Sequence, residues 1–93
     1  MRYLHIKWVH KNSSDPVQIY SEIDDHSYEV RKVEVYKDGR KGYADSSGEY
    51  GGTALGAMPV PSLADIAAQP EFEPKEIPAE EFHNIWMKRR GKP

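Results

Sequence analysis

Tyrosine and charged side chains gather in residues 20–43 of this 93-residue chain. Tyrosine beside cations is typical of recognition surfaces, because a rigid ring gives a large contact area at a low cost in conformational entropy. The same cations could hold phosphate groups while a tyrosine stacks on a base. We therefore take the following residues as a candidate binding surface: Tyr20, Glu22, Arg31, Lys32, Tyr36, Arg40, Lys41 and Tyr43.

Residue types that carry catalysis or bind metals are present, but their spacing favours neither task. The histidines include no pair at the i, i+4 spacing of a helical metal site, and the chain has no cysteine. The acidic run at residues 22–25 could do acid–base work only if one carboxylate were buried, and it lies at a strand end where solvated carboxylates are common. We predict no metal, no cofactor and no catalytic residue. An enzyme that uses Glu22 or His10 is the alternative ranked last.

A β-hairpin is predicted where the Asp-Gly pair at residues 38–39 separates two runs of strand-forming residues. Both central residues of a type I′ turn need positive φ, which Asp tolerates and Gly favours, so a two-residue loop is expected. This loop would place Val35 opposite Gly42 and Val33 opposite Ala44. The two valines would then share a face with two small residues that leave room for a packed helix.

Two earlier stretches, residues 3–10 and 17–23, alternate apolar and polar side chains, as strands with one buried face do. With strands at 28–36 and 41–45 they predict a four-stranded antiparallel meander within residues 2–45. The buried face of this sheet is expected to carry Leu4, Ile6, Trp8, Val17, Ile19, Val33 and Val35. The opposite, tyrosine-rich face would stay uncovered, either as a binding face or as an ordinary solvated sheet surface.

The third strand has an irregular spacing, because Val30 and Val33 are three residues apart where strict alternation requires two. An extra residue near Arg31 and Lys32 would form a β-bulge and turn both cations outward. A strand buried on both faces is the alternative.

The segment at residues 46–61 contains four glycines and two prolines, which predicts a loop. No Gly-Lys-Ser/Thr follows these glycines, so the segment is not a phosphate-binding P-loop. Long ordered loops are often functional, and this one would lie at the rim of the tyrosine-rich face.

Two helices are predicted at about residues 62–69 and 78–90, joined by an extended acidic linker, with Gly91 ending the second helix. The second helix carries one apolar stripe, formed by Phe82, Ile85 and Trp86, that would cover one face of the sheet. The expected fold is a single α+β domain over residues 1–93: a meander sheet, one covering C-terminal helix and a short preceding helix.

The balance of charge and hydropathy limits the partners. A net charge of −2 argues against a general nucleic-acid binder, which usually has a strongly basic domain. No run approaches the roughly 20 apolar residues of a membrane span, and the N-terminus does not have the pattern of a signal peptide. We therefore expect a cytoplasmic protein with no membrane partner. A homodimer formed through the tyrosine-rich face is an open alternative.

Short motifs occur in a definite order along nearly the whole chain. They are Trp8-x-His10, Pro16, Tyr20-Ser21-Glu22-Ile23-Asp24, Glu29-x-Arg31-Lys32-Val33-Glu34, Asp38-Gly39, Gly51-Gly52-Thr53-x-Leu55-Gly56, Pro59-Val60-Pro61, Pro70-Glu71-Phe72, Glu81-Phe82 and Trp86. In this order they resemble an uncharacterised family of small, mostly single-domain bacterial proteins, classed as a domain of unknown function. The resemblance implies the same compact α+β domain and carries no activity or catalytic residues.

Small stand-alone bacterial domains of this sort often resemble immunity proteins of toxin systems or phage-encoded inhibitors, which is an analogy at the level of the fold. We expect a non-enzymatic binding protein that acts as a stoichiometric inhibitor or immunity-like partner of another protein. The alternative is a protein that sequesters a small anionic, nucleotide-like ligand, for example a phage counter-defence sponge.

Overall fold

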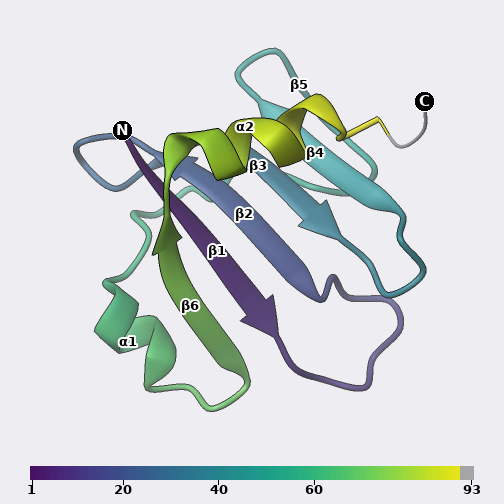
Figure 1. Ribbon diagram of the computed structural model, residues 1–93, viewed down its shortest axis with the longest axis horizontal. Helices are drawn as coiled ribbons and strands as arrows, with labels where there is room; N and C mark the ends of the chain where they lie inside the picture. The colour runs from purple at the N-terminus through teal and green to yellow at the C-terminus, as the bar shows by residue number, and fades with distance from the viewer. Residues whose placement is uncertain (91–93) are drawn as a thin grey trace.

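The computed structural model describes residues 1–90 and shows one antiparallel sheet with two helices, which confirms an α+β fold (Figure 1). The sheet has six strands in the order β5-β4-β3-β2-β1-β6, so the prediction of four strands is wrong. The strands are β1 (Arg2–Trp8), β2 (Gln18–Ile23), β3 (Glu29–Val35), β4 (Lys41–Asp45), β5 (Gly48–Tyr50) and β6 (Phe72–Ile77). The helices are α1 (Leu63–Ala67) and α2 (Ala79–Met87).

The two additional strands lie at the two edges of the sheet. Strand β5 follows β4 through a tight turn in which Ser47 donates hydrogen bonds to the carboxylate of Asp45. Strand β6 is the segment predicted as an acidic linker, and it pairs with β1 from Tyr3 opposite Ile77 onward. It contains Pro74, which an edge strand tolerates because one side of its backbone has no ladder partner.

The helices are shorter than predicted at both ends. Helix α1 begins after Ser62, whose side-chain oxygen accepts a hydrogen bond from the backbone N–H of Asp65 at 3.1 Å. Ser62 is therefore the N-cap of α1. Gly91, predicted to end α2, lies outside the described residues. No helix within residues 1–90 has the length and apolar character needed to cross a membrane.

The β3–β4 hairpin has a three-residue loop instead of the predicted two-residue loop. The backbone N–H of Tyr36 donates to Arg40 O, and the N–H of Gly39 donates to Tyr36 O. Gly39 alone in this loop has a positive φ, of 91°, as in a type I turn followed by a left-handed residue. The extra loop residue shifts the register by one, so Val33 pairs with Tyr43 and Glu34 with Gly42.

A one-residue shift moves every side chain of a strand to the other face. Helix α2 therefore covers the tyrosine-bearing face, which the sequence had predicted to be open. Phe82 and Trp86 of α2 pack with Val33 and Ile77, and Tyr3 and Tyr43 lie beside them. Leu4, Ile23 and Ala44 lie on the opposite face and are fully buried.

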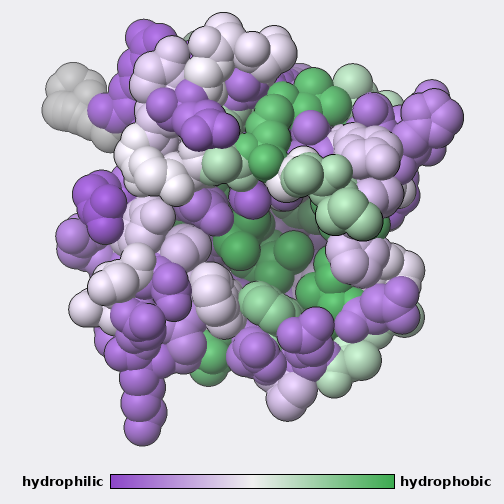
Figure 2. All heavy atoms as spheres, turned by 180° about the vertical axis from the view of Figure 1, so that it is seen from behind, coloured by the Kyte–Doolittle hydropathy of each residue, from purple (hydrophilic) through white to green (hydrophobic). Residues whose placement is uncertain are grey.

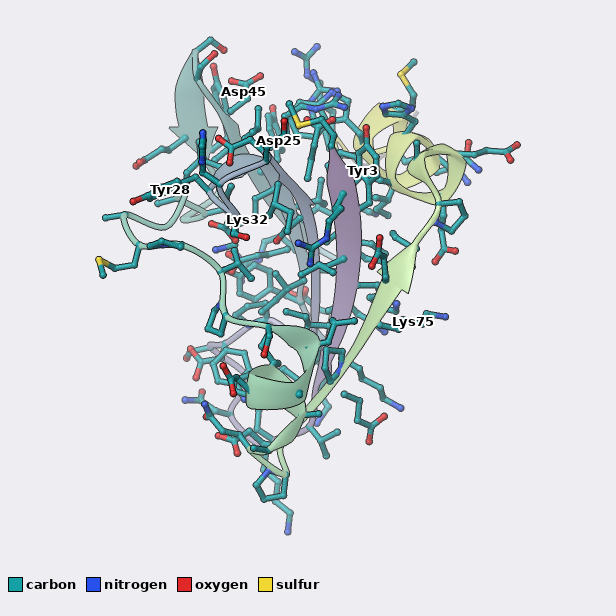
Figure 3. The ribbon with its side chains drawn as sticks, turned by 90° about the vertical axis from the view of Figure 1, so that its left-hand side faces the viewer. Tyr3, Asp25, Tyr28, Lys32, Asp45 and Lys75 are labelled. Atoms are coloured by element: carbon teal, nitrogen blue, oxygen red, sulfur yellow. The ribbon has the colours of Figure 1, made fainter. Side chains whose placement is uncertain are left out.

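That opposite face is covered by the segment at residues 51–62 and by α1. In Figure 3, seen along the sheet, Tyr3 lies on the side of α2 and Lys32 lies on the side of this segment. Helix α1 packs against β6, so the sheet is enclosed unequally: by α2 on one face and by a loop and a short helix on the other (Figure 1).

Strand β3 has its irregularity at Val30, one residue before the predicted bulge. Glu22 pairs with Arg31 and Ile23 pairs with Glu29, which leaves Val30 as the extra residue. The strand is also covered on both faces, which was the open alternative. Arg31 and Lys32 consequently point to opposite faces and do not both turn outward.

Candidate functional site

A charged pair lies beneath α2. The guanidinium of Arg31 donates two hydrogen bonds to the carboxylate of Glu22, from Nε at 2.6 Å and from Nη2 at 2.9 Å. Its central carbon also lies 5.1 Å from the ring centroid of Phe82 and 5.0 Å from that of Trp86. Arg31 thus bridges the sheet and the helix through a bidentate ion pair and two cation–π contacts.

The electrostatics of this pair do not favour acid–base chemistry. Hydrogen bonds from Arg31 lower the pKa of Glu22, against the opposing effect of its burial, and a hydrogen bond from Tyr3 lowers it further. Burial and the neighbouring Glu22 raise the pKa of the Tyr3 phenol. A carboxylate with a lowered pKa is a weak base at neutral pH. We conclude that Glu22 stabilises the fold as a charged group.

Acidification is expected to reduce stability through Glu22. The pKa of Glu22 is lower in the folded than in the unfolded chain, so Glu22 contributes stability above its ordinary pKa of about 4.3. This contribution is lost as the pH falls through the pKa that Glu22 has in the folded protein. Glu22→Gln should therefore flatten the fall of the urea unfolding midpoint below about pH 4.3. Glu49→Gln, at an exposed position of β5, should keep the wild-type fall. An unchanged profile in Glu22→Gln would contradict this role.

A second charged cluster lies on the opposite face, under the segment at residues 53–56. The ammonium of Lys32 lies 3.4 Å from Glu29 Oε1 and 4.0 Å from Glu34 Oε2. It also donates to the backbone carbonyl of Ala54 at 3.3 Å, while the backbone N–H of Gly56 donates to Glu29 Oε1 at 2.6 Å. Lys32 therefore holds the loop on the sheet.

Two buried hydroxyl groups complete this attachment. Ser21, which is 2% exposed, donates to Glu29 Oε2 at 3.1 Å. Thr53, which is 1% exposed, donates to Glu34 Oε1 at 2.7 Å. Both carboxylates thus have partners on the sheet and on the loop. This cluster therefore fixes the start of residues 56–61 on the sheet.

An apolar groove opens beside this cluster, between the sheet, residues 56–61 and α1. Its volume is about 390 Å³. Figure 2 shows hydrophobic atoms in a central hollow of this face, with hydrophilic atoms around it. The apolar residues that line the groove are Ile6, Ile19, Met58, Pro59, Val60, Pro61, Ile66 and Phe72. Apolar hollows of this kind are the usual place for a ligand or partner.

A smaller, basic cleft lies at the other end of the molecule, between the β3–β4 hairpin and the end of α2. Its volume is about 320 Å³. It is lined by Gly39, Arg40, Lys41, Tyr43, Arg89 and Arg90. Three residues of the candidate binding surface, Arg40, Lys41 and Tyr43, therefore lie in this cleft. Arg31 and Lys32 belong instead to the charged clusters under α2 and under residues 53–56.

The predicted surface residues do not share one surface. Tyr20 stacks on the His5 ring, with centroids 4.3 Å apart, and burial raises the pKa of its phenol. Tyr36 is only 8% exposed, and the guanidinium of Arg40 lies 4.1 Å from its ring centroid. Tyr43 is covered by Tyr50, whose centroid is 4.7 Å away. The separation follows from the register shift and from α2.

The other catalytic alternative, His10, also has structural partners. Its Nε2 is 2.8 Å from the backbone carbonyl of Pro16, and its Nδ1 accepts from the backbone N–H of Asn12 at 3.0 Å. Both ring nitrogens thus brace the β1–β2 turn. Within residues 1–90, no group of three or more histidine or acidic residues has the arrangement of a metal site.

Sequence reasoning missed the residues of the groove and half of the basic cleft. The apolar run Met58-Pro59-Val60 in this glycine-rich loop was the available signal for the groove. Arg89 and Arg90 give no signal of a site by themselves, since cations are favoured near any helix C-terminus. Their proximity to the hairpin depends on the path of the whole chain.

Comparison with known proteins gives one positive result, which concerns the family. No curated protein and no solved structure matches the chain significantly. Residues 2–91 match a family described as a domain of unknown function, DUF6881. This match covers nearly the whole chain, in agreement with the ordered motifs described above. The chain therefore belongs to the DUF6881 family.

Proposed function

We propose that this protein is a non-enzymatic binding protein that takes apolar side chains of a protein partner into the groove beside residues 56–61. The observation that carries this proposal is the open apolar hollow itself (Figure 2). An apolar patch rimmed by polar residues is typical of interaction sites, and large side chains that fill such pockets supply most of the binding energy of protein interfaces.

The wall of the groove favours a protein over a small ligand. Met58 lines the groove and is 75% exposed, so it offers contact area outside the hollow as well as within it. Methionine adapts its shape readily and is common on surfaces that bind proteins. A partner that binds here would cover both the hollow and its rim. This chain would then act on that partner as a stoichiometric inhibitor or immunity-like protein. We further propose that this protein acts in the cytoplasm.

Met58→Lys is expected to weaken partner binding at least tenfold, or by about 1.4 kcal/mol, because a charge would enter an apolar contact. Met87→Lys is the matched control, since Met87 is 79% exposed and lies on α2, on the other face of the sheet. Proteins retained from cell lysate by the wild-type chain and by Met87→Lys, but lost with Met58→Lys, would be purified and reconstituted. Native mass spectrometry should then show a complex of one copy of each chain.

The same measurements can reject the proposal. If Met58→Lys and Met87→Lys retain the same proteins, the groove is not the contact surface. If native mass spectrometry shows a homodimer of the wild type that Met58→Lys dissociates, the groove serves self-association instead. If the partner is chemically altered faster in the presence of this protein than alone, the protein acts as an enzyme.

A further inference from the structure

The basic cleft lies on the α2 side of the sheet, away from the apolar groove. Four of the six residues that line it are cationic, and none is acidic. A basic cleft is notable in a chain whose net charge is −2. The cations come from two distant parts of the sequence: Arg40 and Lys41 from the hairpin, and Arg89 and Arg90 from the segment after α2.

The positive charge of this cleft is not neutralised by ion pairs within residues 1–90. The cations of the ion pairs in this part of the chain are Arg2, Arg31 and Lys32. Two carboxylates near the cleft have other partners. Asp38 accepts the backbone N–H of Arg40 at 3.0 Å. Asp45 accepts hydrogen bonds from Ser47, and these lower its pKa. The charge of Arg89 lowers the pKa of Asp45 further, although the two side chains form no ion pair within residues 1–90.

Two of the cations are held in place by aromatic rings. The guanidinium of Arg40 lies 4.1 Å from the ring centroid of Tyr36. That of Arg89 lies 4.1 Å from the centroid of Trp86 and 5.2 Å from that of Tyr43. A guanidinium that stacks through its flat face keeps its edge N–H groups available for an anion.

Arg89 also has unused hydrogen-bonding capacity. Its Nη1 donates to the backbone carbonyl of Trp86 at 2.9 Å. Its Nε is buried and has no acceptor in the described part of the chain. Buried donors in proteins normally have a partner, and an orphaned one requires an explanation. An anion bound in the cleft would be a suitable acceptor.

We propose that this cleft binds a phosphate monoester group, with Arg40, Lys41, Arg89 and Arg90 as its ligands. Arginine recognises phosphate through paired N–H groups, and lysine contributes a point charge. The base of a nucleotide would gain little, because Tyr50 stacks against Tyr43 at 4.7 Å and Arg89 also lies against that ring. This differs from the nucleotide site expected from the sequence, in which a tyrosine stacks on the base.

The test is a titration of the ¹⁵N-labelled protein with inorganic phosphate, adenosine 5′-monophosphate and adenosine, followed by NMR at low salt. We expect saturable shifts of the amides at residues 39–43 and 89–90 with both phosphates, at similar affinity, and none with adenosine. Raising the ionic strength should weaken binding, because salt screens exposed charges.

Arg40→Gln should weaken phosphate binding about tenfold, as expected for the loss of a charge-assisted hydrogen bond. Lys37→Gln is the matched control, because Lys37 is an exposed cation of the same hairpin loop that does not line the cleft. Equal weakening by the two variants, or shifts that do not saturate, would reduce the effect to diffuse attraction and overturn the proposal. Binding of adenosine alone would show that the base is recognised, which would also overturn it.

Discussion

Replacing Arg31 by methionine is expected to lower the free energy of unfolding by about 3 kcal/mol, because it leaves the Glu22 carboxylate buried without its cation. Glu22 is 7% exposed and receives two hydrogen bonds from Arg31. The substitution also removes the cation–π contacts to Phe82 and Trp86 that tie α2 to the sheet. Urea unfolding at pH 7, followed by tryptophan fluorescence, measures the loss.

Two further variants separate the ion pair from general packing. Arg2→Met should change the unfolding free energy by less than about 0.5 kcal/mol, since its pair with Glu76 is long, at 4.0 Å, and exposed. The double variant Glu22→Gln/Arg31→Met should recover part of the stability lost in Arg31→Met, because the uncompensated charge is then absent. A single Arg31→Met variant as stable as the wild type would show that this pair does not hold α2.

The sequence predicted local structure much better than it predicted which side chains lie on which face of the sheet. The β3–β4 hairpin, the cap of α1 and the apolar stripe of α2 each follow from residues close together in the chain. The choice between a two-residue and a three-residue hairpin loop does not, since both place Gly39 at positive φ. That choice alone decides whether Val33 pairs with Ala44 or with Tyr43.

The edge strand β6 was missed for a related reason. Its residues Phe72–Ile77 include Pro74 and three charged side chains, a composition typical of loops. They form a strand because β1 supplies a long ladder and because an edge position accepts proline and exposed charges. Without β6 there is no place for α1, and without α1 the groove has no far wall. The candidate site therefore depended on a strand that local propensity argues against.

Replacing Gly42 by alanine is the second large expected effect, with a loss of about 2 kcal/mol in the free energy of unfolding. A Cβ atom at this position would overlap Thr53 Oγ1 and would lie 2.9 Å from the backbone carbonyl of Gly51. Thr53 cannot simply move away, because it is buried and donates to Glu34 at 2.7 Å. Gly48→Ala is the control, since the atoms nearest to its Cβ would belong to the side chain of the exposed Tyr50 and not to the backbone.

The same substitution links the fold to the proposed binding site. If Gly42→Ala forces Thr53 off the sheet, it loosens the segment that continues to Met58 and forms the wall of the groove. Partner binding should then fall together with stability. Hydrogen exchange of the Gly56 and Val60 amides, which donate to Glu29 and to Ser27 O, reports the loosening directly. Unchanged exchange of these amides in Gly42→Ala would mean that the sheet and the loop are not coupled through Thr53.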